Sequence, residues 1–429
     1  MTPETVRVGL LGCGNVGAPL VELIRRRRDD IAARTGLRLD VTRVAVRSLA
    51  RERPVELPDG VLTLDAAGLV VDPGIDVVVE VIGGIEPARE LILAALKAGK
   101  PVVTGNKELL ANVGAELFAA AEEAGVDLLF EAAVAGGIPF IRPLRESLAG
   151  ERIDRILGIV NGTTNYILTR MTEEGASYAD ALSEAQSLGY AERDPSADVE
   201  GYDAAAKAAI IASIAFGVRV VAGDVFHEGI ADITTADIDY AAKMGYVVKL
   251  LAVAEQPRGS GDVAVRVHPA MVPADHPLAS VRDSFNALFV EGEAVGDLMF
   301  YGRGAGGYPT ASAVLGDLID AALNRAKGSH ASVGALAKAR IRPIDEVESA
   351  YYLNLDVLDR PGVLAAVAGI FGRHGVSIRS MEQEGLGDEA RLVFITHIAR
   401  EADVQSTIRD LHHLDAVDRI TSVLRVVGG

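Results

Sequence analysis

The sequence has little of what disulfide-stabilised, membrane-spanning or nucleic-acid-binding proteins need. Cys13 is its single cysteine, which excludes an internal disulfide framework and a metal cluster held by thiolates. No apolar run is long enough to span a bilayer. Acidic residues outnumber basic ones by 60 to 42, and the net charge of −18 argues against a nucleic acid or an anionic membrane as partner. A local basic pocket could still bind a phosphate.

What remains is a long and apolar chain. With 429 residues, of which 49% are hydrophobic, it has enough material for roughly two to three domains. The N-terminal sequence MTPETVRVGLLG enters a strand directly and lacks the basic-then-apolar organisation of a signal peptide. We therefore expect a soluble, cytoplasmic protein.

The first predicted element is an apolar strand at 6–11, followed by the glycine-rich sequence GCGNVG at 12–17 and a helix to about residue 28. A strand, a GxGxxG turn and a helix in this order are typical of a dinucleotide-binding domain. Gly12 permits the tight turn, Gly14 lets a pyrophosphate approach the backbone, and Gly17 lets helix and strand pack closely. The alternative is a glycine-rich turn needed only for packing.

The second strand, predicted at 41–46, indicates which dinucleotide is bound. Asp40 stands about twenty residues past the glycines, where an acidic residue would bind the ribose hydroxyls, but it precedes the predicted strand. At the carboxyl end of the strand, where the ribose lies, stands Arg47, with Arg51 and Arg53 beyond it. An arginine there suits a 2′-phosphate, which favours NADP(H), alone or alongside NAD(H). The alternative is that Arg47 is a solvated surface residue.

The alternation of strands and helices continues as expected for a parallel sheet. Apolar strands are predicted at 75–81, 101–104 and 126–130, and helices at 86–98 and 108–124. Ligands of open parallel sheets collect at the carboxyl ends of the strands, and Lys107 lies there, just after the strand at 101–104. A lysine at a helix start is unfavourable against the helix dipole, which favours a functional role over a solvated surface position.

Two further segments are rich in small residues. EAAVAGGIP at 131–139 exposes backbone carbonyls, which could bind a cation or could permit close packing between domains, and the residues alone favour packing. GRGAGG at 302–307 is a second glycine-rich turn before a helix predicted at 310–326. This turn could close over the nicotinamide end of the cofactor or merely return the chain to the first domain.

The most unusual stretch is GYAERDPSADVEGYDAAAK at 189–207, because its charged residues lead straight into the apolar segment AAIIASIAF. Buried charges are rare unless they are paired or functional. Glu192 and Asp198 are expected in a loop. Asp203 and Lys207 stand four residues apart and share one face of the predicted buried helix, where they could pair with each other or act together on a bound ligand.

The regions between these motifs carry fewer signals. A strand at 153–161 leads into a polar turn at 162–165, and a helix at 177–188 has Ser177 as its N-cap and Gly189 as its C-terminal stop. A helix is predicted at 237–254 and a strand at 264–267. His268 and His276 are expected in loops beside prolines, and neither is assigned a role. The mixed segment 329–349 is predicted to be a linker.

The last segment, 351–429, has a pattern of its own. Strands are predicted at 351–359, 377–384, 391–397 and 420–427, with helices at 363–374 and 401–411. The resulting order is βαββαβ, the ferredoxin-like arrangement.

Taken together, these motifs resemble homoserine dehydrogenase. The resemblance rests on GCGNVG, TGNKELLA, EAAVAGGIP, NGTTNYIL and above all AQSLGYAERDPSADVEGYDAAAK, in this order over about residues 1–330. The βαββαβ segment, with DRPGVLAAVAGIFGRHGVSI, resembles an ACT domain, an amino-acid-sensing module. The implied fold class is α/β. Its parts are a Rossmann-like NAD(P)-binding domain at 1–130 completed by 301–328, a mixed α+β substrate-binding and dimerisation domain at 131–300, a linker at 329–350 and an ACT domain at 351–429.

The resemblance also implies site residues. Lys107 and Lys207 match the family's two active-site lysines, and we favour Lys207 as the acid/base with Lys107 as its electrostatic partner. The acids around the substrate would be Glu192, Asp198 and Asp203. The cofactor site would include Gly12, Gly14, Asn15, Val16, Gly17, Arg47, Thr104, Lys107 and Gly304. The backbone carbonyls that would hold a sodium ion are those of Glu131, Val134, Gly136 and Ile138.

The implied activity is the NAD(P)H-dependent interconversion of L-aspartate 4-semialdehyde and L-homoserine, in the biosynthesis of threonine, methionine and isoleucine. The ACT domain implies feedback control by L-threonine, although such domains also serve as dimerisation surfaces, and a homodimer or homotetramer is expected. The alternative is a catalytically inactive amino-acid sensor. The presence of Lys107, Lys207, Glu192 and Asp203 together weighs against it, because an idle site has no need of all four.

Overall fold

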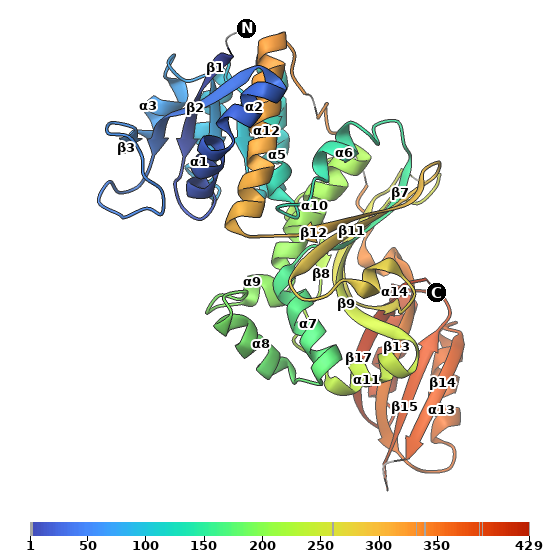
Figure 1. Cartoon of the computed structure of the whole chain (residues 1–429). Helices are drawn as coiled ribbons and strands as arrows, with labels where there is room; N and C mark the ends of the chain where they lie inside the picture. Colours follow the sequence, from blue (N-terminus) through green and yellow to red (C-terminus); the bar gives the residue numbers. More distant parts are fainter. Residues whose placement is uncertain are drawn as a thin grey trace. The chain divides into compact units, whose positions relative to one another are not determined.

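The computed structural model describes residues 3–259, 261–331, 333–338, 340–385, 387 and 389–428. The chain forms two compact units, each assembled from separate stretches of sequence (Figure 1). The first unit contains Met1–Asp154, Ala206–Val225 and Asn286–Ala339, and the second contains Arg155–Ala205, Phe226–Phe285 and Arg340–Gly429. In the described part of the chain, no helix is long and apolar enough to cross a membrane.

The first unit is built on a parallel six-stranded sheet in the order β3-β2-β1-β4-β5-β6. Its strands are β1 (Glu4–Leu11), β2 (Leu37–Ala45), β3 (Leu62–Thr63), β4 (Val77–Glu80), β5 (Val102–Thr104) and β6 (Leu128–Leu129). The helices around it are α1 (Gly17–Arg26), α2 (Arg28–Thr35), α3 (Ala66–Val71), α4 (Ala88–Lys97), α5 (Lys107–Ala124) and α12 (Gly307–Lys327). The centre of the sheet is buried on both faces, as its continuous apolar strands predict.

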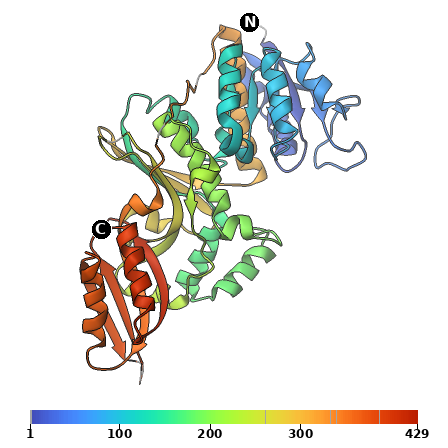
Figure 2. The same cartoon turned by 180° about the vertical axis from the view of Figure 1, so that it is seen from behind.

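Helices cover both faces of this sheet. α1 and α12 pack together on one face, and α3, α4 and α5 lie on the other, as the opposite views in Figures 1 and 2 show. Val314 and Leu318 of α12 share a core with Val8 and Leu10 of β1. A helix almost 300 residues further along the chain therefore completes the first hydrophobic core.

Two predictions in this unit need correction. The helix expected to run to residue 28 is interrupted at Arg27, where α1 ends and α2 begins. The strand expected at 41–46 begins earlier, at Leu37, so that Asp40 lies inside β2 with its side chain exposed rather than before the strand. The early half of β2 alternates apolar with charged residues, which is the pattern of a half-buried strand, and the predicted range left this half out. Asp40 still lies away from the carboxyl end of the strand.

The first unit also contains elements outside this sheet and its covering helices. They are η1 (Glu131–Ala133), α6 (Ile141–Arg145), η2 (Ala222–Asp224), and the neighbouring strands β11 (Phe285–Gly292) and β12 (Gly296–Arg303). Helix α10 (Tyr202–Phe216) begins in the second unit and continues into the first from Ala206 onwards.

The second unit contains a long mixed sheet in the order β7-β9-β10-β17-β13-β15-β14, with β8 on β10 and β16 on β13. Its strands are β7 (Ile153–Ile159), β8 (Phe226–His227), β9 (Tyr246–Glu255), β10 (Ala264–Pro273), β13 (Glu348–Leu358), β14 (Ile378–Gly385), β15 (Glu389–Thr396), β16 (Ala399–Arg400) and β17 (Val417–Val426). Its helices are α7 (Gly162–Glu174), α8 (Tyr178–Ser187), α9 (Ser196–Val199), α11 (Thr235–Lys243), η3 (Pro277–Ser280), η4 (Ile344–Glu346), α13 (Val363–Arg373) and α14 (Glu401–His412).

The C-terminal elements follow the predicted βαββαβ order, with the two-residue strand β16 added. Helices α13 and α14 cover one face of their strands and share a core with Leu353, Leu392 and Phe394 (Figure 2). This sheet is not separate from the rest of the unit, because β17 pairs in parallel with β10 through Ala270 opposite Arg425. The sequence contains no local signal for this junction.

Four further predictions in this unit differ from the structure. The helix expected at 237–254 ends at Lys243, and 246–255 form strand β9, which the β-branched residues of this stretch favour. The polar turn expected at 162–165 is the first turn of α7, and Asp198 lies on the short helix α9 rather than in a loop. His268 lies on β10 and is 3% exposed. Burial, with Arg425 and Arg266 nearby, holds the pKa of His268 well below its usual value.

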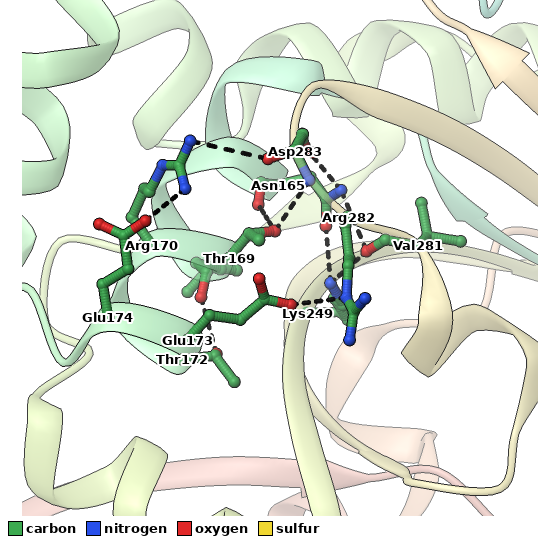
Figure 3. Close-up of polar contacts among 11 residues, drawn as sticks. Asn165, Thr169, Arg170, Thr172, Glu173, Glu174, Lys249, Val281, Arg282 and Asp283 are labelled. Atoms are coloured by element: carbon green, nitrogen blue, oxygen red, sulfur yellow. Dashed lines mark hydrogen bonds and ion pairs between the residues drawn. The ribbon is translucent and has the colours of Figure 1, made fainter.

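A buried lysine anchors the segment that follows η3 (Figure 3). Lys249 of β9 donates hydrogen bonds to the side-chain oxygen of Asn165, at 3.0 Å, and to the carbonyl of Val281. The Asn165 amide in turn donates to the carbonyls of Asp283 and Phe285, at 2.9 and 3.2 Å. Burial lowers the pKa of Lys249 to about 8.

Candidate active site

The glycine-rich sequence forms the predicted strand–turn–helix. Gly12 has a φ of +97° directly after β1. A Cβ atom on Gly17 would lie 2.2 Å from the carbonyl oxygen of Gly12, so the turn closes only with glycine there. A Cβ atom on Gly14 would meet no atom within 4 Å. The backbone of Gly14 is thus open to a ligand, and the turn fits the pyrophosphate of a dinucleotide.

The second glycine-rich turn packs against this first one. A Cβ atom on Gly307 would lie 2.5 Å from the carbonyl oxygen of Asn15. The same turn also contacts the 131–139 segment, because a Cβ atom on Gly136 would lie 2.4 Å from the carbonyl oxygen of Gly304. The Gly137 amide donates to the carbonyl of Arg303 at 3.0 Å. The turn thus returns the chain to the core of the first unit, and it does so beside the glycine-rich loop at 12–17.

The carboxyl ends of β4 and β5 carry a buried polar cluster. The Thr104 hydroxyl donates to the Glu80 carboxylate at 2.5 Å, and Glu80 also accepts from the amides of Ile82 and Gly83. Asn106 is the N-cap of α5, because its side chain accepts from the Leu109 amide at 3.1 Å. This cluster fixes the start of α5. The Thr104 hydroxyl is already used within this cluster, because it donates to Glu80 and accepts from the Asn106 amide.

The two lysines lie on different helices of the first unit. Lys107 is the first residue of α5 and half-buried, and Lys207 lies in the second turn of α10 and is 8% exposed. Arg47 comes two residues after the end of β2 and is exposed. Arg53 braces this loop through the carbonyls of Ser48 and Arg51.

The 131–139 segment adopts an unusual backbone conformation. Ala135 and Gly136 both have positive φ, at 53° and 40°. The hydrogen bonds within this segment use the carbonyls of Phe130, Glu131 and Ala135. Positive φ at two successive residues turns their carbonyls away from a regular helix or strand, and carbonyl oxygens are ligands that hard cations accept. In the described part of the chain, no group of three His, Cys, Asp or Glu side chains could hold a metal.

The Glu131 side chain has a structural role that the sequence did not reveal. Its carboxylate accepts from the amides of Phe140, Ile141 and Arg142 at 2.5, 2.7 and 2.8 Å, and so caps the N-terminus of α6. The Glu131 amide donates to Asp317 of α12 at 2.7 Å. Burial raises the pKa of Asp317 to about 7. Both ends of Glu131 are therefore fixed by its neighbours.

The acidic stretch forms a carboxylate pair in the second unit. Asn161, the N-cap of α7, donates through its amide nitrogen to Asp198 at 2.6 Å and to Asp203 at 2.9 Å. The other end of the same amide accepts from the Thr164 backbone amide at 2.9 Å. Two carboxylates held side by side suit a cationic group such as a substrate ammonium. Sequence reasoning missed Asn161, although an Asn directly before a helix is a recognised N-cap signal.

The rest of this stretch lies around the pair. Glu192 is exposed on the turn after α8, and its carbonyl accepts from the Gln186 side chain at 3.1 Å. Ser177 caps α8 and Gly189 ends it with a φ of +77°, as predicted. Asp203 and Lys207 lie one turn apart on α10, also as predicted. The structure thus joins Asp198 to Asp203 through Asn161 and leaves Glu192 on the surface turn.

Comparisons with known proteins agree with these features. Residues 139–319 match the homoserine dehydrogenase family, residues 12–131 match the NAD-binding domain of homoserine dehydrogenase, and residues 351–415 match the ACT domain. The chain is 52% identical to a homoserine dehydrogenase of Corynebacterium glutamicum over 427 residues, covering 99% of this chain and 96% of the relative. It is 41% identical to that of Bacillus subtilis, with 99% of each covered.

Solved structures give the same result. A homoserine dehydrogenase from Thiobacillus denitrificans superposes with a TM-score of 0.93 at 42% identity, covering 99% of both chains. A hyperthermophilic archaeal homoserine dehydrogenase in complex with NADPH has a TM-score of 0.65 at 31% identity, covering 75% of this chain and 98% of that one. The chain therefore belongs to the homoserine dehydrogenases, NAD(P)-dependent oxidoreductases of amino-acid biosynthesis, and carries an NAD-binding domain and a C-terminal ACT domain.

Proposed function

We propose that this chain interconverts L-aspartate 4-semialdehyde and L-homoserine with Asp198 and Asp203 as substrate-binding acids and Lys207 as the acid/base. The observation that carries this proposal is the carboxylate pair that Asn161 holds in the second unit, with Lys207 one helical turn beyond Asp203. A substrate ammonium on the carboxylates would satisfy their charges. Glu192 would add a third carboxylate from the surface turn.

The dinucleotide would lie on the glycine-rich turn, with its pyrophosphate over Gly14 and the N-terminus of α1. When bound, it supplies the hydride for reduction of the aldehyde. Asn15, Val16, Thr104 and Gly304 would complete its site through their backbones, and exposed Arg47 would bind the 2′-phosphate of NADP(H). The archaeal relative's NADPH complex supports use of this cofactor.

Reduction of an aldehyde needs a proton at the developing alkoxide. An ammonium group supplies this proton or stabilises the charge, so a lysine close to the carbonyl suits the step. Lys207 would donate the proton in reduction and accept it in the reverse direction. Lys107 would raise the positive potential there, which makes proton loss from Lys207 easier.

A sodium ion on the carbonyls of Glu131, Val134, Gly136 and Ile138 would stiffen the segment that contacts the second glycine-rich turn. The positive φ of Ala135 and Gly136 supports this assignment, because carbonyls at such residues do not follow the hydrogen-bonding pattern of a helix or strand. The ion would order the protein and take no part in the proton transfer.

Regulation and organisation follow the same family pattern. L-threonine would act through the ACT domain, and the chain would assemble as a cytoplasmic homodimer or homotetramer. The four predicted segments, 1–130 with 301–328, 131–300, 329–350 and 351–429, would serve as cofactor, substrate, linker and regulatory parts.

Replacing Lys207 tests the catalytic role. We expect Lys207→Ala to lower kcat by about a hundredfold or more, because general acid catalysis contributes on that scale. The measurement is NADPH consumption at saturating aspartate semialdehyde. Lys97→Ala, at an exposed lysine of α4, is the matched control and should keep the wild-type kcat. A Lys207→Ala enzyme with near-normal turnover would exclude Lys207 as the proton donor.

A further inference from the structure

The last ACT strand ends in a buried cluster of ionic groups. Arg425 of β17 is 4% exposed. Its guanidinium donates to Glu401 of α14 at 2.8 and 3.0 Å, and Glu401 also accepts from the Tyr351 hydroxyl at 2.7 Å. These contacts lie within the ACT segment. A buried arginine with this many partners has one fixed position relative to its strand.

The same guanidinium also binds a residue outside the ACT segment. It donates to both oxygens of Glu228 at 2.6 and 3.3 Å. Glu228 directly follows β8, and its amide donates to the carbonyl of Val267 on β10 at 2.8 Å. Arg425 therefore binds ACT helix α14 and the substrate half of the unit at the same time. Bidentate arginine–carboxylate pairs are geometrically specific, so a movement of β17 would be transmitted to Glu228.

Glu228 begins a segment that lies directly against the acidic stretch. A Cβ atom on Gly229 would lie 2.4 Å from the carbonyl oxygen of Val199, and the Ile230 amide donates to the same carbonyl at 2.9 Å. A Cβ atom on Gly201 would lie 3.2 Å from the carbonyl oxygen of Glu228. Backbone thus touches backbone on both sides of the junction between α9 and α10, with no flexible side chain between them.

The α9–α10 junction carries the carboxylate pair. Asp198 precedes Val199 on α9, and Asp203 lies in the first turn of α10. Asn161 joins both carboxylates through one amide. A shift of the 228–230 segment would therefore change the spacing of the two acids. Packed interfaces of this kind switch between discrete arrangements rather than deforming continuously.

We infer that Glu228, held by Arg425, is a positioning residue through which the ACT strand β17 sets the geometry of Asp198 and Asp203 and thereby the affinity for the amino-acid substrate. This inference rests on the proposed substrate role of the two acids. Regulation would then pass from β17 through the Arg425–Glu228 ion pair to the 228–230 segment. The backbone contact of this segment with the α9–α10 junction would carry it to the carboxylate pair.

The test uses full-length Glu228→Gln, which keeps the shape of a side chain that is 39% exposed while removing its charge. We expect the KM for aspartate semialdehyde to rise about fivefold or more, the scale of a typical coupling between sites. The KM for NADPH and kcat should stay within about twofold of wild type, and the change in substrate KM on adding L-threonine should shrink. Glu228→Asp, which keeps the charge, should restore part of the substrate affinity.

Arg419→Gln is the matched control. Arg419 lies on the same strand, but its guanidinium binds Asp356 at 2.9 Å inside the ACT segment. This variant should keep the wild-type substrate KM. The inference is overturned if Glu228→Gln keeps the wild-type KM and threonine response, or if Arg419→Gln changes the substrate KM as much.

Asp203→Asn separates this inference from the proposed function on which it rests. A raised substrate KM in Asp203→Asn with no effect in Glu228→Gln would overturn the positioning role of Glu228 and leave the substrate role of the acids intact. An unchanged substrate KM in Asp203→Asn removes the substrate role of the acids themselves. Because removing the buried Arg425 would leave the buried Glu401 carboxylate without a positively charged partner, Arg425→Lys is the second variant, and it should reproduce the raised substrate KM of Glu228→Gln.

Discussion

At the scale of single residues, the Asn161 side chain makes two kinds of contact through its two polar atoms. Its oxygen caps α7, and its nitrogen holds Asp198 and Asp203 together. Two carboxylates so close to each other repel, and a shared donor reduces that repulsion. The same residue therefore contributes to helix stability and to the geometry of the proposed substrate site.

Asn161→Ser separates the two tasks. Serine caps a helix about as well as asparagine, so α7 should keep its cap, and the thermal midpoint should fall only by what the lost bonds to Asp198 and Asp203 contributed to the fold. The amide donor is lost, and the substrate KM should rise roughly tenfold or more, because hydrogen bonds to charged groups contribute about 1.5–3 kcal/mol. Steady-state kinetics with aspartate semialdehyde measures this change.

Asn112→Ser is a suitable comparison, since Asn112 is exposed on α5 and donates to a backbone carbonyl one turn earlier, that of Glu108. It should leave the substrate KM unchanged. A wild-type KM in Asn161→Ser would show that the bridge does not matter for substrate binding.

At the scale of elements, two glycines of the glycine-rich turn differ in what they contribute. Gly17 is required by the fold, because its Cβ would collide with the Gly12 carbonyl. Gly14 has a free neighbourhood and no positive φ, so the fold alone tolerates a methyl group there. A ligand that approaches the backbone would explain a glycine at 14.

Gly14→Ala should therefore fold with a wild-type thermal midpoint and bind the cofactor poorly. We expect the KM for NADPH to rise about tenfold or more, because the methyl group occupies the space of the pyrophosphate. Fluorescence titration with NADPH measures the affinity directly. Gly150→Ala, at an exposed glycine whose Cβ would also meet nothing, is the control and should bind NADPH normally. Unchanged NADPH affinity in Gly14→Ala would contradict a dinucleotide at this turn.

At the scale of the whole molecule, the second unit joins substrate and ACT segments into one sheet. Besides the β10–β17 junction, buried Asp237 of α11 accepts hydrogen bonds from the side chains of Tyr352, Asn354 and Ser422 on two ACT strands. The ACT segment is therefore built into the unit rather than attached by a flexible tether. This continuity makes point variants better tests of regulation than truncation, which would expose the edge of β10.

Buried Lys249 makes the stability of this unit depend on pH. Because its pKa falls from 10.5 in the unfolded chain to about 8 in the fold, the unfolded state binds more protons between these values. Stability from this group therefore increases as pH rises from 8 to 10.5, by roughly 3 kcal/mol at most. Lys249→Met should lose this increase, which thermal midpoints across that pH interval would reveal.

Lys97→Met provides the comparison, since Lys97 is exposed and should follow the wild-type pH profile. Parallel profiles for Lys249→Met and wild type would mean that Lys249 titrates normally in the folded protein. The sign of the difference matters more than its size, because removing the ammonium also leaves the Asn165 oxygen and the Val281 carbonyl without this donor.

Local patterns in the sequence determined much of this protein. The glycine-rich turn, most strands and helices of the first 130 residues, the Ser177 cap and the βαββαβ order were predicted correctly, because each depends on neighbouring residues. The short elements β3 and α3 were not predicted. The family was also recognised from motifs of contiguous residues. The roles of the lysines, the acids and the cation segment stay predictions.

Only the tertiary structure decided how distant segments combine. The contacts from Asn161 to the two acids, from Glu131 to Asp317 and from Arg425 to Glu228 join residues 37 to 197 positions apart. The burial of His268 likewise depends on packing around β10, whereas an adjacent proline had indicated a loop. A sequence specifies local conformation through steric preference and periodicity, but side-chain pairs across a fold form only when hydrophobic burial brings their elements together.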